Sequence, residues 1–323
     1  MVVVHHWDAD GISSAAIILR EKGRMPLLTP PVGEFRFDER IKNNINSELV
    51  YFVDLNMPEE VVKLANSGLF AKAVFIDHHI QNPIVHRNII YHNPSVSRVE
   101  YPSASFVASE VFDHTSYLTI IGAVGDLGKK IFEIENFGER VEKIMEAEGL
   151  KKGELFEAVK LIDSNYLSMD RYGVEEAAFF LSKADIDDIL EREDWIRKAE
   201  KIEKEIKDAV NSAIFRGEVA FVSFNSSNAI VSKVARELVW NKKAGACIAV
   251  NKGFNGKYQL YVRLNKKNWR MKTLIEKLKS AGIKTGGKAE VLGSVFDAND
   301  ELLNEALRIV REELAKMGFE VWL

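Results

Sequence analysis

The chain has 323 residues, of which 46% are hydrophobic, which is enough for two globular domains. Its net charge of -4 excludes a protein that binds polyanions over its whole surface. The single cysteine, Cys247, excludes an intrachain disulfide and favours a reducing, cytoplasmic setting. The first expected strand starts directly after Met1, and no apolar run reaches membrane-spanning length, so we expect neither a signal peptide nor a membrane partner.

A first candidate site follows the strand Val2–Val4, whose β-branched residues are typical of a buried parallel strand. The strand leads to His6, Asp8 and Asp10, and their spacing of two in extended backbone predicts that they share one side. Gly11 then predicts a tight turn into an apolar helix. Two carboxylates and an imidazole could hold a divalent cation, although solvated acids at a strand end would look the same.

Two later strands also end in acids or imidazoles, since the run 49–53 precedes Asp54 and the run 71–76 precedes Asp77, His78 and His79. Helices are expected at 38–46 and from Pro58, and a short strand at 25–32. This β-α-β order with short connections predicts an α/β fold with a parallel sheet and right-handed crossovers. Ligands of such sheets bind beyond the carboxyl ends of the strands, so we expect these side chains to converge there.

The rest of the first domain is predicted to be mostly helical. A strand is expected at 87–92, followed by the helix 106–112 with Ser103 as its N-cap. The N-terminus of that helix could contact a phosphate, and a purely structural cap is the alternative. A glycine-rich core helix then carries Asp126, a fourth candidate acid at the site.

The second half of the chain is a separate α/β pattern. The charge-rich, amphipathic segment 185–216 is predicted to be a long helix that connects the domains. We therefore expect a first domain at 1–184, a linker helix at 185–216 and a smaller α/β domain at 217–323. Strands of the last domain are expected at 219–224, 246–251, 257–264 and 288–295, and helices at 229–239, 271–281 and 299–317.

The candidate ligands suit two divalent ions sharing a carboxylate, the usual arrangement for cleaving phosphoesters. Asp54 is the expected bridging residue. His6 and Asp8 would complete one ion, and Asp10, His78 and Asp126 the other, with a water or hydroxide between the ions as nucleophile. Mixed carboxylate and imidazole ligands favour Mn²⁺, with Mg²⁺, Co²⁺ or Zn²⁺ as alternatives. His79 would contact the phosphate or donate a proton, and Asp77 would orient its neighbours.

At these residues the chain resembles the DHH phosphoesterase superfamily. Four motifs match in order: Asp8-Ala9-Asp10-Gly11, Asp54, Asp77-His78-His79 and Gly125-Asp126. The group includes RecJ-like exonucleases, oligoribonucleases, cyclic-dinucleotide phosphodiesterases and family II pyrophosphatases. The resemblance implies a two-manganese phosphodiesterase site with the ligand roles given above.

The last domain resembles the DHHA1-type substrate-binding domain found after many DHH domains. The signature Gly-Gly-His-x-x-Ala-x-Gly corresponds here to Gly286 and Gly287, with Lys288 in place of histidine and Val291 in place of alanine. Lys288 could bind phosphate as a point charge. Arg263 falls where the family has a phosphate-contacting arginine.

The segment 263–288 is strongly basic, with nine basic residues and one acid, and Tyr261 and Trp269 lie beside or in it. A basic groove with aromatic platforms is typical of proteins that hold single-stranded nucleic acid. We expect substrate contacts from Arg263, Lys266, Lys267 and Arg270. Lys272, Lys277 and Lys279 are interpreted instead as a solvated helix face.

These patterns predict a manganese-dependent exonuclease of single-stranded DNA or RNA, acting in repair or replication. We expect 3′-to-5′ cleavage, because the chain lacks the extra module of bacterial RecJ-like enzymes that act 5′ to 3′. The resemblance also implies a helicase as a partner. One alternative is a phosphodiesterase of short oligoribonucleotides, cyclic dinucleotides or 3′-phosphoadenosine 5′-phosphate. A non-enzymatic scaffold in a replication or helicase complex is the other alternative, against which the intact ligand positions argue.

Overall fold

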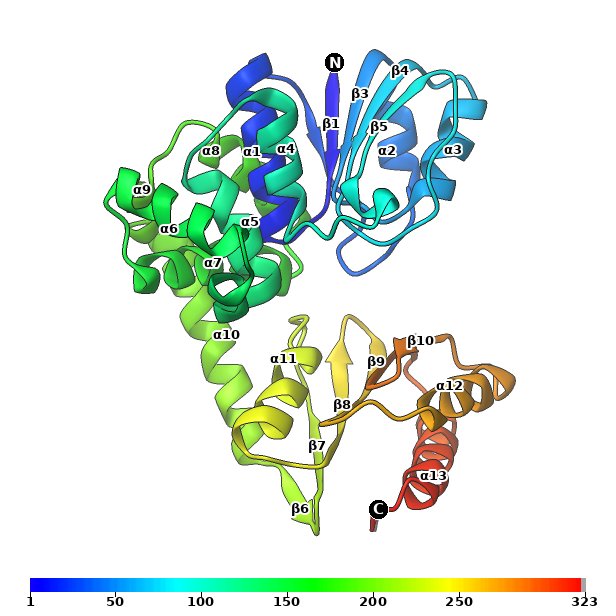
Figure 1. The fold of residues 1–323 in the computed structure, drawn as a ribbon. Helices are drawn as coiled ribbons and strands as arrows, with labels where there is room; N and C mark the ends of the chain where they lie inside the picture. The colour runs from blue at the N-terminus through cyan, green and yellow to red at the C-terminus, as the bar shows by residue number, and fades with distance from the viewer. Residues whose placement is uncertain (321–323) are drawn as a thin grey trace. The chain divides into compact units, whose positions relative to one another are not determined.

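The computed structural model describes residues 1–320, and its internal contacts divide the chain into two units, residues 1–199 and residues 200–323. Figure 1 traces both units from the N-terminus to the C-terminus. No helix within residues 1–320 is long and apolar enough to cross a lipid bilayer.

Unit 1 is built on a parallel sheet, as the sequence predicts. Its strands run in the order β2-β1-β3-β4-β5, and every neighbouring pair is parallel. The order reverses between β1 and β3, so ligands are expected beyond the ends of these two strands. The strands are β1 (Val2–His5), β2 (Leu27–Leu28), β3 (Ser47–Val53), β4 (Phe70–Ile76) and β5 (Ile89–His92).

Helices cover both faces of this sheet because successive residues of each buried strand point to opposite sides. Val4 and Phe52 pack with the core under α2 and α3, whereas Val3 and Val53 pack with the core under α1, α4 and α5 (Figure 1). The helices are α1 (Ala9–Lys22), α2 (Glu39–Asn44), α3 (Pro58–Asn66), α4 (Ala104–Phe112), α5 (Tyr117–Leu127), α6 (Phe137–Glu148), α7 (Lys152–Leu167) and α8 (Arg171–Leu181).

The local geometry expected around the first motif was wrong. The strand β1 stops at His5, Asp8 is the N-cap of α1, and Asp10 lies in the first helical turn rather than in extended backbone. The reason is that the Asp8 carboxylate accepts the backbone N–H of Gly11 at 3.2 Å and so starts the helix early. Gly11 is therefore helical, and a side chain there would collide with His6, whose carbonyl oxygen would lie 2.5 Å from the added Cβ.

The segment 185–216 is interrupted where the sequence predicts one long helix. It forms α9 (Ile186–Leu190), α10 (Glu193–Asn211) and β6 (Ile214–Arg216). Arg192 lies at the break, where its guanidinium stacks over Phe180 and Trp195 and pairs with Glu176 at 2.7 Å. The division between the two units falls within α10.

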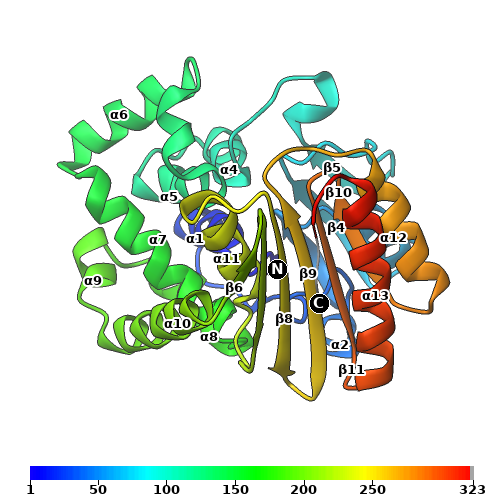
Figure 2. The same ribbon diagram turned by 90° about the horizontal axis from the view of Figure 1, so that it is seen from below.

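Unit 2 is a mixed sheet in the order β10-β11-β9-β8-β7-β6, in which β7 and β8 are parallel and the other pairs antiparallel. The helices α12 and α13 pack on one face, and α11 packs against β8 and β9 (Figure 2). The remaining elements are β7 (Val219–Phe224), α11 (Val231–Arg236), a π-turn (Glu237–Asn241), β8 (Ala246–Phe254), β9 (Lys257–Leu264), α12 (Arg270–Ser280), β10 (Thr285–Lys288), β11 (Val291–Asp297) and α13 (Asp300–Lys316).

The strand expected at 288–295 is shifted and belongs to a hairpin. Gly286 and Gly287 lie within β10 rather than before a strand, and a two-residue turn joins Lys288 to Val291. A Cβ at Gly287 would lie 2.1 Å from the Val291 carbonyl oxygen, which explains why this position is a glycine. The paired glycines therefore have a structural reason in addition to any contact with substrate.

Candidate metal centre

The structure brings all six predicted metal ligands together at the carboxyl ends of β1, β3 and β4. Their ligand atoms form three overlapping groups, each with atoms within 4.8 Å of one another. The groups are His6 with Asp8 and Asp54, Asp10 with His78 and Asp126, and Asp54 with His78 and His79. Residues separated by more than 100 positions in the chain thus meet at the switch point of the sheet.

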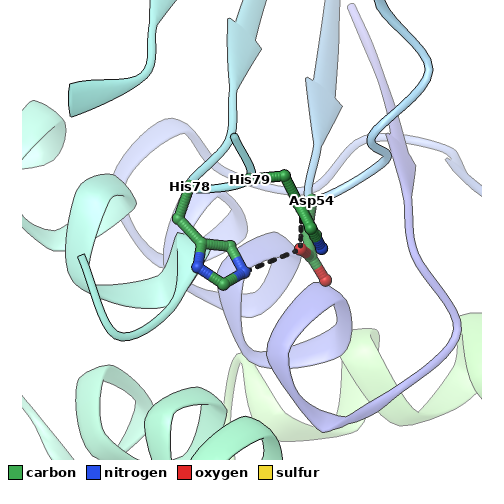
Figure 3. A group of neighbouring side chains, drawn as sticks. All are labelled: Asp54, His78 and His79. Carbon is green, nitrogen blue, oxygen red and sulfur yellow. Dashed lines mark ion pairs between the residues drawn. The ribbon is translucent and has the colours of Figure 1, made fainter. Parts of the chain in front are cut away.

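Asp54 lies between the groups. Its Oδ2 is 3.4 Å from Nδ1 of His6, and its Oδ1 is 3.7 Å from both Nε2 of His78 and Nδ1 of His79 (Figure 3). The residue follows β3 in a left-handed backbone conformation, with φ of 59°, which aspartate tolerates better than most residues. One carboxylate therefore faces two separate sets of ligands, as a bridging residue must.

Several buried atoms of the centre have no hydrogen-bond partner among the described residues. They include Nδ1 of His6, Oδ1 of Asp54 and Nε2 of His78. His6 Nδ1 is 2.8 Å from Asp8 Oδ1, close enough for an ion pair but without the directions of a hydrogen bond. Unsatisfied buried polar atoms are costly, and oxygen and imidazole nitrogen are good ligands of divalent cations. The donor set therefore fits a metal.

The protonation of the centre shows how strongly its charges interact. Burial raises the pKa of Asp54 well above its ordinary value, and the carboxylates of Asp10 and Asp8 add to the shift. Burial, followed by the charge of Asp126, raises the pKa of Asp10 to about 7. For His6, burial favours the neutral ring, but the carboxylates of Asp8 and Asp54 together outweigh burial and raise the pKa well above the usual range. Cations would replace these protons as the counter-charge.

Asp10 is held by the N-terminus of α4. Its two carboxylate oxygens accept the backbone N–H groups of Ala104 at 2.7 Å and Ser105 at 2.9 Å. Helix α5 approaches closely at Gly122, where an added Cβ would lie 2.1 Å from Asp10 Oδ1. These contacts fix the carboxylate, and a side chain at position 122 would displace it.

Asp77 supports His79 instead of joining the ligand groups. Its carboxylate accepts the backbone N–H groups of Asn56, His78 and His79, and its Oδ1 lies 2.7 Å from Nδ1 of His79. Burial opposes ionisation of Asp77, but the interactions with His79 and the hydrogen bond from the Asn56 backbone together outweigh burial, and the pKa is lowered. The bond fixes the His79 ring with Nδ1 toward Asp77, so that Nε2 is the nitrogen available to other groups.

Ser103, for which a phosphate contact is expected, lies in the core at the start of α4. The Ser103 side chain is fully buried, and its hydroxyl accepts the N–H of Phe106 while it lies 2.7 Å from the hydroxyl of Ser105. The first amides of α4 are already bound to Asp10. In this structure Ser103 caps the helix, which is the alternative given above, and its contact with a phosphate stays a prediction.

The predicted substrate residues of unit 2 lie on or near its surface. The guanidinium of Arg263 stacks over the ring of Trp240 at 4.6 Å, and its Nε is buried without a hydrogen-bond partner among the described residues. Arg270 stacks on Trp269 at 4.6 Å and lies 3.9 Å from Glu313. Five others are exposed: Lys266, Lys267, Gly286, Gly287 and Lys288.

Asp163 is a supporting residue that the sequence did not reveal. It lies in α7 and accepts the backbone N–H of Ala9 at 3.1 Å, which satisfies a free amide in the first turn of α1. The contact steadies the segment that carries Asp8 and Asp10. A single acid within a helical pattern carries no local signal for such a role.

Comparison with known proteins supports the same centre. Residues 1–133 match the DHH family, N-terminal domain. The fold is similar to that of a DHH-domain protein described as a member of a family of ribosomal proteins, with a TM-score of 0.67, 19% identity, and coverage of 97% of this chain and 86% of that chain. It is also similar to exonuclease RecJ bound to manganese, with a TM-score of 0.67, 16% identity, and coverage of 99% and 90%.

A third similar structure is a pGpG-specific phosphodiesterase from Vibrio cholerae, with a TM-score of 0.53, 13% identity, and coverage of 96% of this chain and 98% of that chain. No curated protein sequence matches the chain. At these identities the structural similarities establish the fold, whereas the family match covers the residues that form the candidate centre. Residues 1–133, which match the DHH family, N-terminal domain, thus include all the candidate metal ligands gathered at one edge of the sheet.

Proposed function

We propose that this protein is a manganese-dependent exonuclease that hydrolyses phosphodiester bonds in single-stranded DNA or RNA. The observation that carries the proposal is Asp54, whose two oxygens face two separate ligand groups. Two divalent cations bound there would activate water and stabilise the charge on a phosphate. Mixed carboxylate and imidazole donors suit Mn²⁺, with Mg²⁺, Co²⁺ and Zn²⁺ as alternatives.

His79 is the proposed contact to the reacting phosphate. Its side chain is 36% exposed, unlike the buried Asp54, and Asp77 fixes its ring through Nδ1. A neutral ring oriented in this way presents a lone pair at Nε2, and a protonated ring presents an N–H. The protonated form would hydrogen-bond a phosphate oxygen or transfer a proton to the leaving group.

The choice of single-stranded nucleic acid rests on unit 2. Lys266 and Lys267 are exposed, and the exposed ring of Trp269 lies beside them in the chain. Cations interleaved with aromatic rings bind single strands through the phosphates and by base stacking, without reading sequence. Similarity in fold to manganese-bound RecJ supports the same choice. Cleavage from the 3′ end and cooperation with a repair or replication helicase are parts of this proposal.

The test is digestion of 5′- and 3′-labelled single strands of DNA and RNA with added Mn²⁺. The proposal expects ladders that shorten one nucleotide at a time, faster than any cleavage of duplexes. The position of the label that is lost first gives the direction. The Asp54→Asn variant is the control, and cleavage that survives in it would show a contaminating nuclease.

A phosphodiesterase of dinucleotides is the second candidate, because the fold also resembles the pGpG-specific enzyme. The two differ in their preference for length. If kcat/KM for a dinucleotide exceeds that for a 20-mer, the exonuclease proposal is wrong. If the wild type cleaves neither substrate while it binds a helicase, the chain is a scaffold.

A further inference from the structure

An exposed aromatic ring lies directly beside the candidate metal centre. Phe35, in the loop between β2 and α2, is 60% exposed, although a phenylalanine ring gains by burial. It stacks against the imidazole of His6, with ring centroids 5.9 Å apart and an interplanar angle of 24°. It also contacts the ring of the buried Trp7 at 5.2 Å. None of the four motifs in the sequence includes Phe35.

The loop that carries Phe35 is anchored at both ends. Arg171 donates two hydrogen bonds to the carboxylate of Asp38, at 2.6 and 3.0 Å, and a third at 2.7 Å to the carbonyl oxygen of Thr29. The Thr29 hydroxyl in turn donates to the carbonyl oxygen of His5 at 2.8 Å. The loop is thereby tied to the same strand end that presents His6, so the ring has a defined place beside the centre.

We propose that Phe35 stacks on the nucleobase of the nucleotide whose phosphate lies at the metal centre. This inference rests on the proposed function and assigns a residue that holds the base of the nucleotide at the centre. Because the ring of Phe35 stacks on His6, a candidate metal ligand, it is placed to contact the group next to the bound phosphate. In a nucleotide that group is a sugar with a planar base, and every base has a face that can stack on an aromatic ring. Phe35 is a substrate-positioning residue in this account.

The experiment compares two strands that differ only in their terminal nucleotide. One carries a normal base and the other an abasic tetrahydrofuran sugar, and each modification is made separately at the 5′ and the 3′ end. For wild type and Phe35→Ala, kcat and KM are measured with Mn²⁺. Affinity is measured by fluorescence anisotropy on strands in which a methylene group replaces the leaving-group oxygen of the terminal linkage, so that this bond cannot be hydrolysed.

Stacking predicts that Phe35→Ala weakens binding of the intact strand about tenfold and binding of the abasic strand less than twofold. Phe35→Trp should restore the preference for the base. Tyr172→Ala is the matched control, because Tyr172 is an exposed aromatic residue of the same unit whose ring packs with Arg40, and it should change neither strand.

Equal losses on both strands would mean that Phe35 only supports His6, and no loss on either would mean that it contacts nothing in the substrate. Either result overturns the stacking inference while leaving the exonuclease proposal intact. If the wild type cleaves neither strand, both proposals are wrong.

Discussion

The two units handle charged side chains in opposite ways. In unit 1, Asp10, Asp54 and His78 converge at one sheet edge, where buried carboxylates face one another and imidazoles lie beside them. In unit 2 the basic side chains lie mostly at the surface, and one buried acid neutralises part of them. That acid is Glu313, which is 1% exposed and lies 2.7 Å from Lys277 and 2.9 Å from Lys316.

The contrast shows which charges imply a ligand. A buried charge without a partner is expensive, so a fold that keeps several together requires something to bind them. An exposed charge is solvated by water and therefore needs no bound ligand. We therefore expect changes in unit 1 to act through metal binding, and changes in unit 2 to act through salt-dependent affinity for nucleic acid.

The largest expected effect is that of Asp54→Asn. Loss of the shared carboxylate should lower Mn²⁺-dependent cleavage more than about a hundredfold, beyond the range typical of residues that merely support a ligand. The metal-free variant should melt at a higher temperature than the metal-free wild type, because burial makes the ionised Asp54 unfavourable. Thermal melts with and without Mn²⁺, together with cleavage rates, check both parts.

Glu59→Gln is the matched control, since it removes one negative charge from the exposed first turn of α3. It should leave both cleavage and the Mn²⁺-induced rise in melting temperature unchanged. An Asp54→Asn variant that keeps the full Mn²⁺-induced rise would contradict the bridging role.

The same contrast explains what the sequence could predict. Hydrophobic runs that end in acids predicted the parallel sheet and the convergence of His6, Asp54 and His78, because parallel strands place their carboxyl ends at one edge. The predicted backbone geometry at Asp10 was wrong, although the residue does lie at the site. A period of two applies only while the backbone stays extended, and the Asp8 cap ends the extended segment.

Contacts between distant segments could not be predicted from local patterns. The segment 263–288 has a net charge of +8 by composition, but Glu313, which binds Lys277, belongs to the last helix. Ser103 was recognised as a cap, and the acid that occupies the amides of its helix, Asp10, lies 94 residues before Ala104. Such pairings depend on tertiary packing, which propensity and spacing do not encode.

The second prediction concerns Asp77→Asn. Asparagine keeps the shape, but its amide nitrogen cannot accept the N–H of Asn56, and the weaker acceptor orients His79 less firmly. Cleavage should fall about ten- to a hundredfold, with a smaller change in Mn²⁺ affinity than in Asp54→Asn. Parallel measurements of kcat, KM and Mn²⁺ binding by calorimetry test this. Complete loss of Mn²⁺ binding would make Asp77 a ligand instead.

The third prediction is a pH dependence of the metal-free protein. Burial, then the charge of Asp126, raises the pKa of Asp10 to about 7 from an ordinary value of 3.8. Between about pH 4 and 7 the folded state therefore holds a proton that the unfolded state has lost, so Asp10 makes stability fall as pH rises. In thermal melts, the melting temperature of Asp10→Asn relative to that of the wild type should therefore rise by several degrees from pH 4 to pH 7.

Comparing Asp10→Asn with the wild type separates the contribution of Asp10 from that of His5, which changes stability with pH in the opposite direction. Burial lowers the pKa of His5 to about 4, which makes stability rise with pH between about 4 and 6.5. His5 is present in both proteins, so its contribution cancels in the difference. With saturating Mn²⁺, the wild type should be more stable than Asp10→Asn at pH 7. A difference in melting temperature that does not vary with pH would contradict the raised pKa.

The smallest expected effect is in unit 2, where exposed lysines are exchanged for alanine. The double change Lys266→Ala with Lys267→Ala should weaken binding of a single strand a few-fold and lower the salt slope by about 1.4, because two phosphate contacts are lost. Lys277→Ala should change neither quantity, since that ammonium is already bound to Glu313. Anisotropy titrations at several salt concentrations separate the two. Equal effects of all three lysines would mean that unit 2 attracts nucleic acid only through its overall charge. Unit 1 would then be the unit with a localised site, and unit 2 would contribute no specific contact.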